Sequence, residues 1–143
     1  MKTLHIFATI AVIVLFVAAS CKKTEGNWKK MKLDKTEVVF NSEGGEEIVT
    51  VLNYSALWLG GAETYRFVNA EWQVDRLFSP QNSDVAITQD VLEGDWIHAL
   101  VPDKGKSNKV IITVDKNEQG NPRRAYIQIT YGDAGAGITV TQE

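Results

Sequence analysis

Aromatic side chains gather in the middle of the chain and are the residues best suited to contact a ligand. Trp58, Tyr54 and Tyr65 lie close together in the sequence. Flat aromatic rings pack on the apolar faces of sugar rings, and polar groups beside them bind the hydroxyls. Trp58 shortly precedes Gly60-Gly61 in an apparent loop, so we expect it to be the most exposed of the three. These three residues are therefore the candidate ligand-binding residues, and carbohydrate is the expected ligand class.

Large aromatic residues are also what a β-sandwich without a disulfide needs in its core. On this ground we expect Trp72 and Trp96 to be buried. For Trp58 the core position and the exposed position both stay open. The substitution Trp58→Ala distinguishes them, because loss of an exposed ring leaves thermal stability intact whereas loss of a core ring does not.

The chain offers little for catalysis. Its only cysteine is Cys21, and beyond the N-terminal segment its only histidine is His98, which we expect to be at the surface or half-buried. The sequence contains no Gly-x-Ser-x-Gly motif and no phosphate-binding glycine loop. Acidic residues in a turn, such as Asp90, Glu93 and Asp95, are expected to be solvated rather than paired for glycoside cleavage. We therefore expect a protein that is not an enzyme, with no catalytic residue and no cofactor.

One segment resembles part of a metal site. Asp115 and Asn117, followed by Gly120, are similar to the first half of a calcium-binding loop. Such a loop needs a bidentate glutamate at its twelfth position, where this chain has Tyr126. A hairpin loop rich in turn-forming residues is the favoured interpretation, and no metal site is expected.

The start of the chain carries signals for export. Lys2 gives a basic start, residues 6–19 are apolar apart from one threonine, and the small residues Ala18-Ala19-Ser20 precede Cys21. This pattern is typical of a secretory signal peptide (residues 1–20), and the apolar run is too short for a permanent transmembrane helix. Residues 17–21 resemble a bacterial lipobox, which predicts cleavage before Cys21 and attachment of lipid to its sulfur.

The lipobox predicts the location of the protein. Two or more acyl chains on Cys21 anchor a protein stably to a membrane without a spanning helix. We expect a lipoprotein at the bacterial outer membrane, on either its periplasmic or its outer side, with residues 21–30 as lipidated cysteine and tether. Trp28 in this tether either packs on the domain or lies at the lipid interface, where tryptophan is favoured.

The composition predicts one folded domain, over residues 31–143, and argues against a nucleic-acid partner. The chain of 143 residues has 18 acidic and 15 basic side chains, a net charge of −3, and no basic cluster. The expected domain is long enough for a single hydrophobic core. If Cys21 carries lipid, no thiol is left for a disulfide, so packing alone must hold the fold.

Short strands separated by turns predict an all-β fold, a sandwich of about seven or more antiparallel strands. The clearest strand signals fall in residues 37–40, 46–53, 96–101, 109–115, 123–131 and 138–142. Within residues 46–53, the run 48–52 is apolar and β-branched nearly throughout, which indicates a strand buried on both sides or near the centre of a sheet. Residues 54–89 fit either strand or helical spacing, and their aromatic and β-branched content favours strand.

Residues 123–131 alternate most clearly between the two faces of a strand. One set is expected to face the core: Ala125, Ile127, Ile129 and Tyr131. The other set is expected to face water: Arg124, Tyr126, Gln128 and Thr130. The following residues, 132–137, are expected to form a turn before a last strand with Ile138 and Val140 pointing inward.

Two regions of the chain resemble BACON domains. Residues 33–53 contain Glu37-Val38-Val39-Phe40 followed by Gly44-Gly45 and a β-run. Residues 96–142 contain the strand from Lys109, the Arg123-x-Ala125-x-Ile127 pattern and the closing Val-Thr-Gln. The resemblance implies an immunoglobulin-like sandwich, export in Bacteroidetes and carbohydrate binding, a function proposed for the family largely from its association with carbohydrate-active enzymes.

The middle segment, residues 54–95, is longer than the family pattern, so no family ligand site is carried over onto it. The sequence therefore leads to two hypotheses. The first is an envelope module that binds a glycan. The second is a structural or protein-interaction subunit, whose partner is another envelope protein and which has no sugar site.

Overall fold

The computed structural model describes residues 28–80 and 87–143. Cys21 and the expected signal peptide lie outside the described residues. The regular elements are β1 (Glu37–Phe40), β2 (Gly45–Thr50), β3 (Trp58–Val68), β4 (Glu71–Phe78), β5 (Val91–Glu93), β6 (Ile97–Leu100), the short 3-10 helix η1 (Asp103–Gly105), β7 (Lys109–Val114), β8 (Arg123–Tyr131) and β9 (Ala134–Gln142). Neither described range contains a helix long and apolar enough to cross a membrane.

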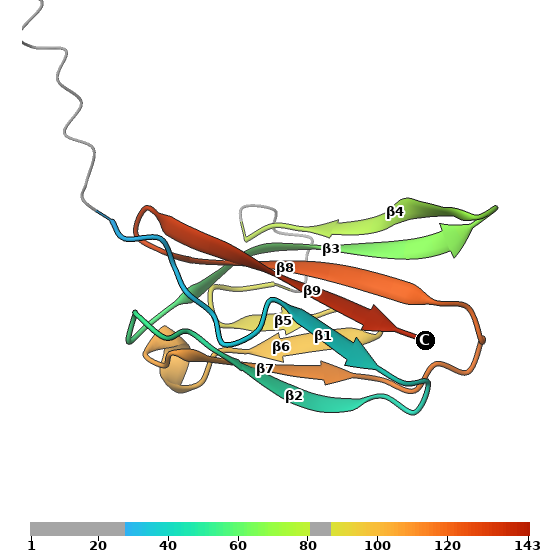
Figure 1. Cartoon of the computed structure of the whole chain (residues 1–143), viewed down its shortest axis with the longest axis horizontal. Helices are drawn as coiled ribbons and strands as arrows, with labels where there is room; N and C mark the ends of the chain where they lie inside the picture. Colours follow the sequence, from blue (N-terminus) through green and yellow to red (C-terminus); the bar gives the residue numbers. More distant parts are fainter. Residues whose placement is uncertain (1–27, 81–86) are drawn as a thin grey trace, which may run out of the picture.

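The strands form two sheets that lie one over the other (Figure 1). The five-stranded sheet has the order β1-β9-β8-β3-β4, and the four-stranded sheet has the order β2-β7-β6-β5. The first strand runs parallel to the last, and every other pair of named strands is antiparallel. The chain passes back and forth between the two sheets, so that strands distant in the sequence become neighbours within a sheet, as in immunoglobulin-like sandwiches. The expected immunoglobulin-like β-sandwich is confirmed.

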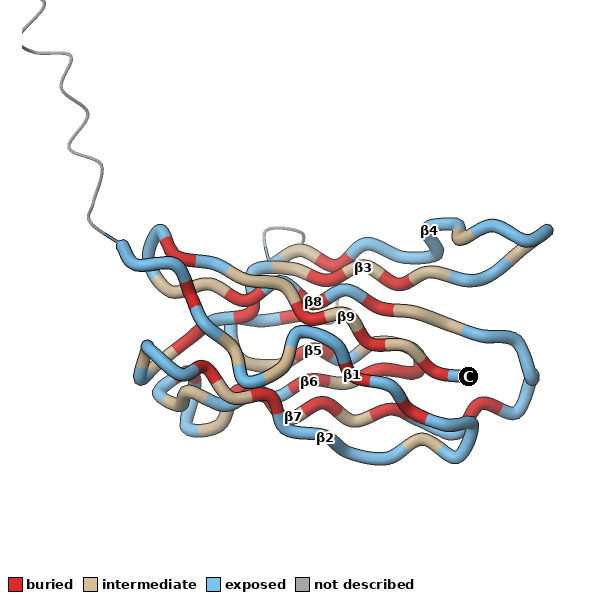
Figure 2. Tube along the Cα trace, viewed as in Figure 1, coloured by how far each residue is buried: buried red, intermediate tan, exposed pale blue. Residues whose placement is uncertain are grey.

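The core lies between the sheets, and buried positions alternate with exposed ones along the strands (Figure 2). Aliphatic side chains that are fully buried come from both layers: Val49, Val110 and Ile112 from the four-stranded sheet, and Ile127, Ile129, Ile138 and Val140 from the five-stranded sheet. Each such side chain contributes about 1.5–3 kcal/mol when it leaves water. The inward and outward sets expected for residues 123–131 are confirmed over Arg124–Thr130.

The prediction for residues 46–53 is wrong in one respect. Strand β2 is an edge strand rather than a central one, and only one of its faces is buried. Val49 and Val51 are fully buried, whereas Ile48 is 39% exposed and Leu52 is 63% exposed. The apolar and β-branched run at residues 48–52 does not indicate burial on both faces here, because β-branched residues also suit the solvent-facing side of an edge strand.

Residues 58–78 form a long hairpin, so the preference for strand over helix in this region is confirmed. The chain reverses at Asn69 and Ala70, both with positive φ (52° and 64°), as a two-residue type I′ turn requires. The last hairpin also differs from expectation, because β9 begins at Ala134 directly after a tight turn at Gly132. The structure therefore extends the final strand into part of the expected turn.

The segment before β1 packs on the domain from Trp28 onward. The Trp28 ring meets Tyr131 edge to face at 6.0 Å, and a Cβ on Gly132 would lie 2.5 Å from Trp28 ring atoms. Asn53 fixes the same segment, since its amide donates to Lys30 O (2.9 Å) and accepts from Lys32 N (2.8 Å). Of the two positions considered for Trp28, the structure shows packing on the domain.

Gln142, at the end of β9, holds two of the connections that cross between the sheets, β1 to β2 and β7 to β8. Its side chain is fully buried, and Nε2 donates to Asn41 O (3.1 Å), Ser42 O (3.4 Å) and Asp115 O (2.9 Å). Its Oε1 accepts from Arg123 Nε at 2.7 Å. Residues 41–42 join β1 to β2, and Asp115 begins the connection from β7 to β8. One amide therefore satisfies backbone carbonyls on both crossovers.

We expect Gln142→Ala to lower the free energy of unfolding by about 3 kcal/mol, because it removes the hydrogen bonds of a fully buried side chain, leaves Arg123 Nε without its acceptor and opens a cavity. The measurement is the midpoint of chemical denaturation. Glu143→Ala is the matched control, since that neighbouring side chain is exposed and its backbone N–H to Phe40 O is retained. A loss in Gln142→Ala no larger than in the control would contradict this role.

Candidate functional site

The outward face of the five-stranded sheet presents a row of paired residues from β3 and β8. Across the two strands, Trp58 is paired with Thr130, Gly61 with Gln128, Glu63 with Tyr126, and Tyr65 with Arg124. Paired residues of adjacent strands project from the same face of a sheet. From Thr130 to Arg124 this row extends about 20 Å along β8.

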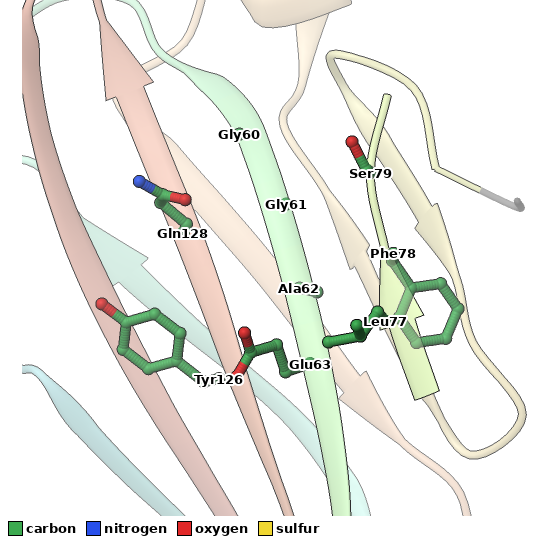
Figure 3. Close-up of a pocket in the computed structure, with 9 residues that line it drawn as sticks. All are labelled: Gly60, Gly61, Ala62, Glu63, Leu77, Phe78, Ser79, Tyr126 and Gln128. Atoms are coloured by element: carbon green, nitrogen blue, oxygen red, sulfur yellow. The ribbon is translucent and has the colours of Figure 1, made fainter. Parts of the chain in front are cut away.

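Two glycines create a hollow in the outward face of the five-stranded sheet. Gly60 and Gly61 leave the floor of β3 without side chains, and the hollow above them measures about 310 Å³. Figure 3 shows Tyr126 and Gln128 from β8 on one side of the glycines and Leu77 from β4 on the other.

A second hollow of about 530 Å³ adjoins the first, because the two share Gly60 and Ser79, and it extends to Trp58 and Thr130. We call the combined feature the outer groove. It is defined by Trp58, Gly60, Gly61, Leu77, Tyr126 and Gln128.

Both aromatic rings of the outer groove are held in place by their neighbours yet keep an accessible surface. Tyr126 and Trp58 are each 41% exposed. The Tyr126 ring lies over Gly137 of β9, where a Cβ would come within 1.9 Å of the Tyr126 hydroxyl oxygen. The Trp58 ring lies 5.8 Å from the Tyr131 ring, centroid to centroid. Exposed rings that are already ordered lose little conformational entropy when a ligand packs on them.

Beyond the outer groove, the same face carries polar and charged groups. The Tyr65 hydroxyl donates to the Glu63 carboxylate. This hydrogen bond, together with partial burial and the negative charge of Glu63, raises the pKa of Tyr65 above its usual value. The phenol therefore stays neutral at physiological pH. Arg124, directly opposite Tyr65, stacks on the Trp72 ring with its guanidinium carbon 4.2 Å from the ring centroid.

The three candidate residues from the sequence are placed differently. Trp58 lines the outer groove. Tyr65 is on the same strand, about 23 Å further along, and its hydroxyl is engaged by Glu63. Tyr54 does not line the outer groove: its hydroxyl donates to Lys29 O, and its ring packs on Tyr131, which the Trp58 ring also contacts. The structure thus brings Trp58 and Tyr65 onto one face and leaves Tyr54 at the end of the sandwich.

Two residues of the outer groove were missed as candidate site residues. Tyr126 and Gln128 were assigned to the solvent-facing side of their strand, and that assignment holds. What the sequence did not indicate is that β3 places Gly60 and Gly61 beside them. The glycine pair was interpreted as part of a loop, although it lies inside a strand at an irregularity in the register between Leu59 and Gly61.

The remaining tryptophans divide between core and surface. Trp96 is buried, 7% exposed, as expected, and Arg123 lies over its ring at 4.7 Å. The expectation for Trp72 is wrong, because this ring lies on the outward face against Phe67 (5.2 Å) and Arg124. Strand β4 is an edge strand, so its aromatic residue packs sideways on neighbours of the same face rather than into the core.

The residues considered for metal binding have structural partners. Asn117 is buried; its Nδ2 donates to Asn121 O (2.7 Å), and its Oδ1 accepts from Gln119 N (3.3 Å). The Asp115 carboxylate contacts His98. These bonds show a loop held by its own side chains, but the expectation of a hairpin is wrong, because residues 115–122 connect β7 in the four-stranded sheet to β8 in the five-stranded sheet. Across the described ranges, no group of three or more histidine, cysteine or acidic residues is arranged to hold a metal.

His98, on β6 of the four-stranded sheet, is a titratable residue with two acidic partners. Its Nδ1 lies 2.8 Å from Glu93 Oε2 and its Nε2 lies 3.2 Å from Asp115 Oδ2, so it links β5 to the end of β7. Partial burial lowers the pKa of His98, but the hydrogen bonds to Asp115 and Glu93 and their negative charges outweigh this and raise it above its usual value. Both ring nitrogens can donate only in the protonated form.

A raised folded-state pKa stabilises the fold below the unfolded-state pKa of about 6.5, and that contribution is lost as the pH rises through the folded-state value. We therefore expect the free energy of unfolding to fall as the pH rises from about 6.5 through this value, and His98→Gln to remove that dependence. Denaturant titrations across this range measure it. Lys35→Gln is the control, since it breaks an exposed ion pair to Glu47 that does not involve His98. An unchanged pH dependence in His98→Gln would refute the assignment.

Comparisons with known proteins agree with this architecture. An NMR structure of a protein from Bacteroides thetaiotaomicron is similar to this chain with a TM-score of 0.58 and 17% identity, covering 85% of this chain and 93% of that one. At this identity the likeness concerns the fold alone. The structure of murine CRIg covers 80% of this chain and 95% of its own at 9% identity, with a TM-score of 0.31, too low to carry an argument. No curated protein matches the chain.

A family model covers the C-terminal part of the chain, from β5 through β9. This part includes the two central strands β8 and β9 and the closing Gln142. The resemblance noted from the sequence is therefore confirmed: residues 84–143 match the BACON family model, described as "Putative binding domain, N-terminal".

Proposed function

We propose that this protein is a non-enzymatic binding module whose outer groove holds a polysaccharide chain. The observation that carries the proposal is the placement of two partly exposed rings, Trp58 and Tyr126, on one face around a floor made of Gly60 and Gly61. The match to a binding-domain family supports the general role, and the chemistry of the groove supports the ligand class.

The shape of the outer groove suits an extended polymer better than a compact small molecule. It is shallow and runs along the strands, so the ends of a bound chain are not enclosed. Sugar rings have apolar faces that pack on aromatic rings and hydroxyls that bond to amides and hydroxyls. The amide of Gln128 and the hydroxyl of Thr130 lie between and beside the two aromatic residues on the same face.

We also propose that the protein is exported and lipid-anchored through Cys21 at the outer membrane. The support is the sequence of residues 1–21, together with the packing of Trp28 on Tyr131, which places the N-terminal connection at one end of the sandwich (Figure 1). The outer groove begins near that end, at Trp58, whose ring packs on the same Tyr131, and continues along β3 and β8 away from it.

A second candidate function is docking of another envelope protein on the same sheet. Large apolar side chains project there with little cover: Leu77 is 64% exposed, Val74 is 54% exposed and Val39 is 65% exposed. Leu77 and Val74 belong to β4, which is an edge of the five-stranded sheet. An exposed edge and scattered apolar residues are features that protein partners use.

The test of the carbohydrate proposal is affinity electrophoresis of the purified protein through gels that contain individual host and plant polysaccharides. We expect retardation by at least one polymer, relieved by its free oligosaccharide. Trp58→Ala and Tyr126→Ala should each weaken binding about tenfold, equivalent to about 1.4 kcal/mol, because each removes one stacking surface.

The control variant is Leu100→Ala. Leu100 is 43% exposed, similar to Trp58, but it belongs to β6 of the opposite sheet. We expect it to bind as the wild type does. Absence of retardation across a broad panel, or equal weakening by all three substitutions, would contradict the groove and favour the protein-docking function.

A further inference from the structure

Arg124 has an unusual environment for an arginine on a protein surface. Its guanidinium stacks on Trp72 at 4.2 Å, and Trp72 in turn packs on Phe67 at 5.2 Å with an interplanar angle of 57°. The Nε atom of Arg124 is buried and, within the described part of the chain, has no hydrogen-bond partner. An N–H group that leaves water without an acceptor is unfavourable, so this arrangement needs an explanation.

The other three arginines of the chain all have acceptors. Arg66 lies 3.4 Å from the Asp75 carboxylate and Arg76 lies 2.7 Å from Asp95. Arg123 donates to Gln142 Oε1 and to the carbonyl oxygens of residues 115 and 116. Among the four arginines, all of which the structure describes, Arg124 is the one whose side chain forms neither an ion pair within 4.0 Å nor a hydrogen bond. Its positive charge is therefore available to a ligand.

An acidic neighbour is close by, yet Arg124 does not pair with it. Glu63 occupies the adjacent register position, opposite Tyr126, and accepts a hydrogen bond from the Tyr65 hydroxyl. Within the described residues no ion pair joins Arg124 to this carboxylate, and its guanidinium lies over the Trp72 ring. A guanidinium that stacks by its face keeps the donors on its edge, which match the two oxygens of a carboxylate.

The position of Arg124 relative to the outer groove indicates which kind of ligand would supply a carboxylate to it. Tyr126 and Gln128 of the groove follow Arg124 at alternate positions of β8, on the same face of the sheet. A polymer that packs on Trp58 and Tyr126 and continues along β8 reaches Arg124 about 7 Å beyond Tyr126. We propose that the polysaccharide is acidic, and that Arg124 binds the carboxylate of a uronate residue in the chain. This inference rests on the proposed function of the outer groove.

The experiment uses pairs of oligosaccharides that differ only at the carboxyl group. The probes are galacturonate hexamers and hyaluronan hexamers, each beside its carboxyl-reduced counterpart, titrated calorimetrically into the purified protein. For at least one pair we expect the acidic member to bind about tenfold more tightly than the neutral one. This preference should decline with added salt, because it is electrostatic.

Substitutions at Arg124 identify the residue responsible. We expect Arg124→Gln to bind the acidic and the reduced oligosaccharide equally, with the affinity that the wild type has for the reduced form. Arg124→Lys should keep part of the preference, since it retains the charge but loses the paired donors. Arg66→Gln is the control, because it removes an arginine that is paired with Asp75, and it should keep the full preference. Thermal unfolding of each variant verifies that it is folded.

The outcomes separate this inference from the proposed function. If the wild type binds both members of each pair equally, or Arg124→Gln keeps the preference, the role of Arg124 is refuted and the groove stands. If the wild type binds neither member of any pair but is retarded by a neutral polysaccharide, binding of a uronate by Arg124 is likewise refuted. If it binds no saccharide at all, both proposals fail. Binding of poly-glutamate with the same dependence on Arg124 would replace the sugar by an acidic protein segment.

Discussion

Gln142 links two of the connections by which the chain crosses between the sheets, β1 to β2 and β7 to β8. The chain has a single cysteine, so no disulfide within it can link the layers, and buried hydrogen bonds must fix how the connections are placed. The amide of Gln142 does this by donating to carbonyls of residues 41, 42 and 115, while its oxygen accepts from Arg123. A buried polar network of this kind stabilises only when all its members are satisfied, which makes one arrangement of the crossovers much better than any alternative.

The register of β8 follows from this network and determines what the outward face presents. Arg123 points inward to Gln142 and Trp96, so its neighbour Arg124 must point outward. The same alternation carries Tyr126, Gln128 and Thr130 to the outward face and the aliphatic residues between them to the core. Two adjacent arginines therefore have separate roles: one holds the fold together, and the other is available to a ligand. A shift of one residue in β8 would exchange them and bury the polar row.

Glycines that leave room for neighbouring side chains determine the shape of the rest of the outward face. Gly137 allows the Tyr126 ring to lie across β9, and Gly60 and Gly61 leave the neighbouring strand bare. The result is a hollow in a surface that side chains would otherwise fill. The groove is therefore a property of four strands together, β3, β4, β8 and β9, which form two hairpins that are distant in the sequence but adjacent in the sheet.

Much of the fold could be predicted from the sequence because its signals are local. The alternation in residues 123–131 and the β-branched run at residues 109–114 are read from one strand at a time. The edge position of β2 could not be predicted, since it depends on which strand pairs with it. The turn at Asn69 and Ala70 could not be recognised in the sequence, because alanine rarely takes positive φ. Trp72 was misplaced for a similar reason, because its partners Phe67 and Arg124 come from other strands.

The candidate site was predicted only in part, for the same physical reason. Trp58 was found because a tryptophan beside two glycines is recognisable in the sequence alone. Tyr126 and Gln128 were placed on the correct face, but their proximity to Gly60 and Gly61 is a matter of pairing between β3 and β8. Tyr54 was included because it is near Trp58 in the sequence, yet the chain turns between them and leaves it against Tyr131.

Chemical-shift mapping by NMR, with an acidic oligosaccharide titrated into the isotopically labelled protein, tests most directly whether the outward face of the five-stranded sheet is the binding surface. We expect the largest changes at the Trp58 indole N–H, the Gln128 side-chain amide and the Arg124 Nε–H, with little change in β2, β5, β6 and β7. Changes confined to the four-stranded sheet or to the ends of the sandwich would contradict the outer groove, and so would the absence of any change at saturating oligosaccharide.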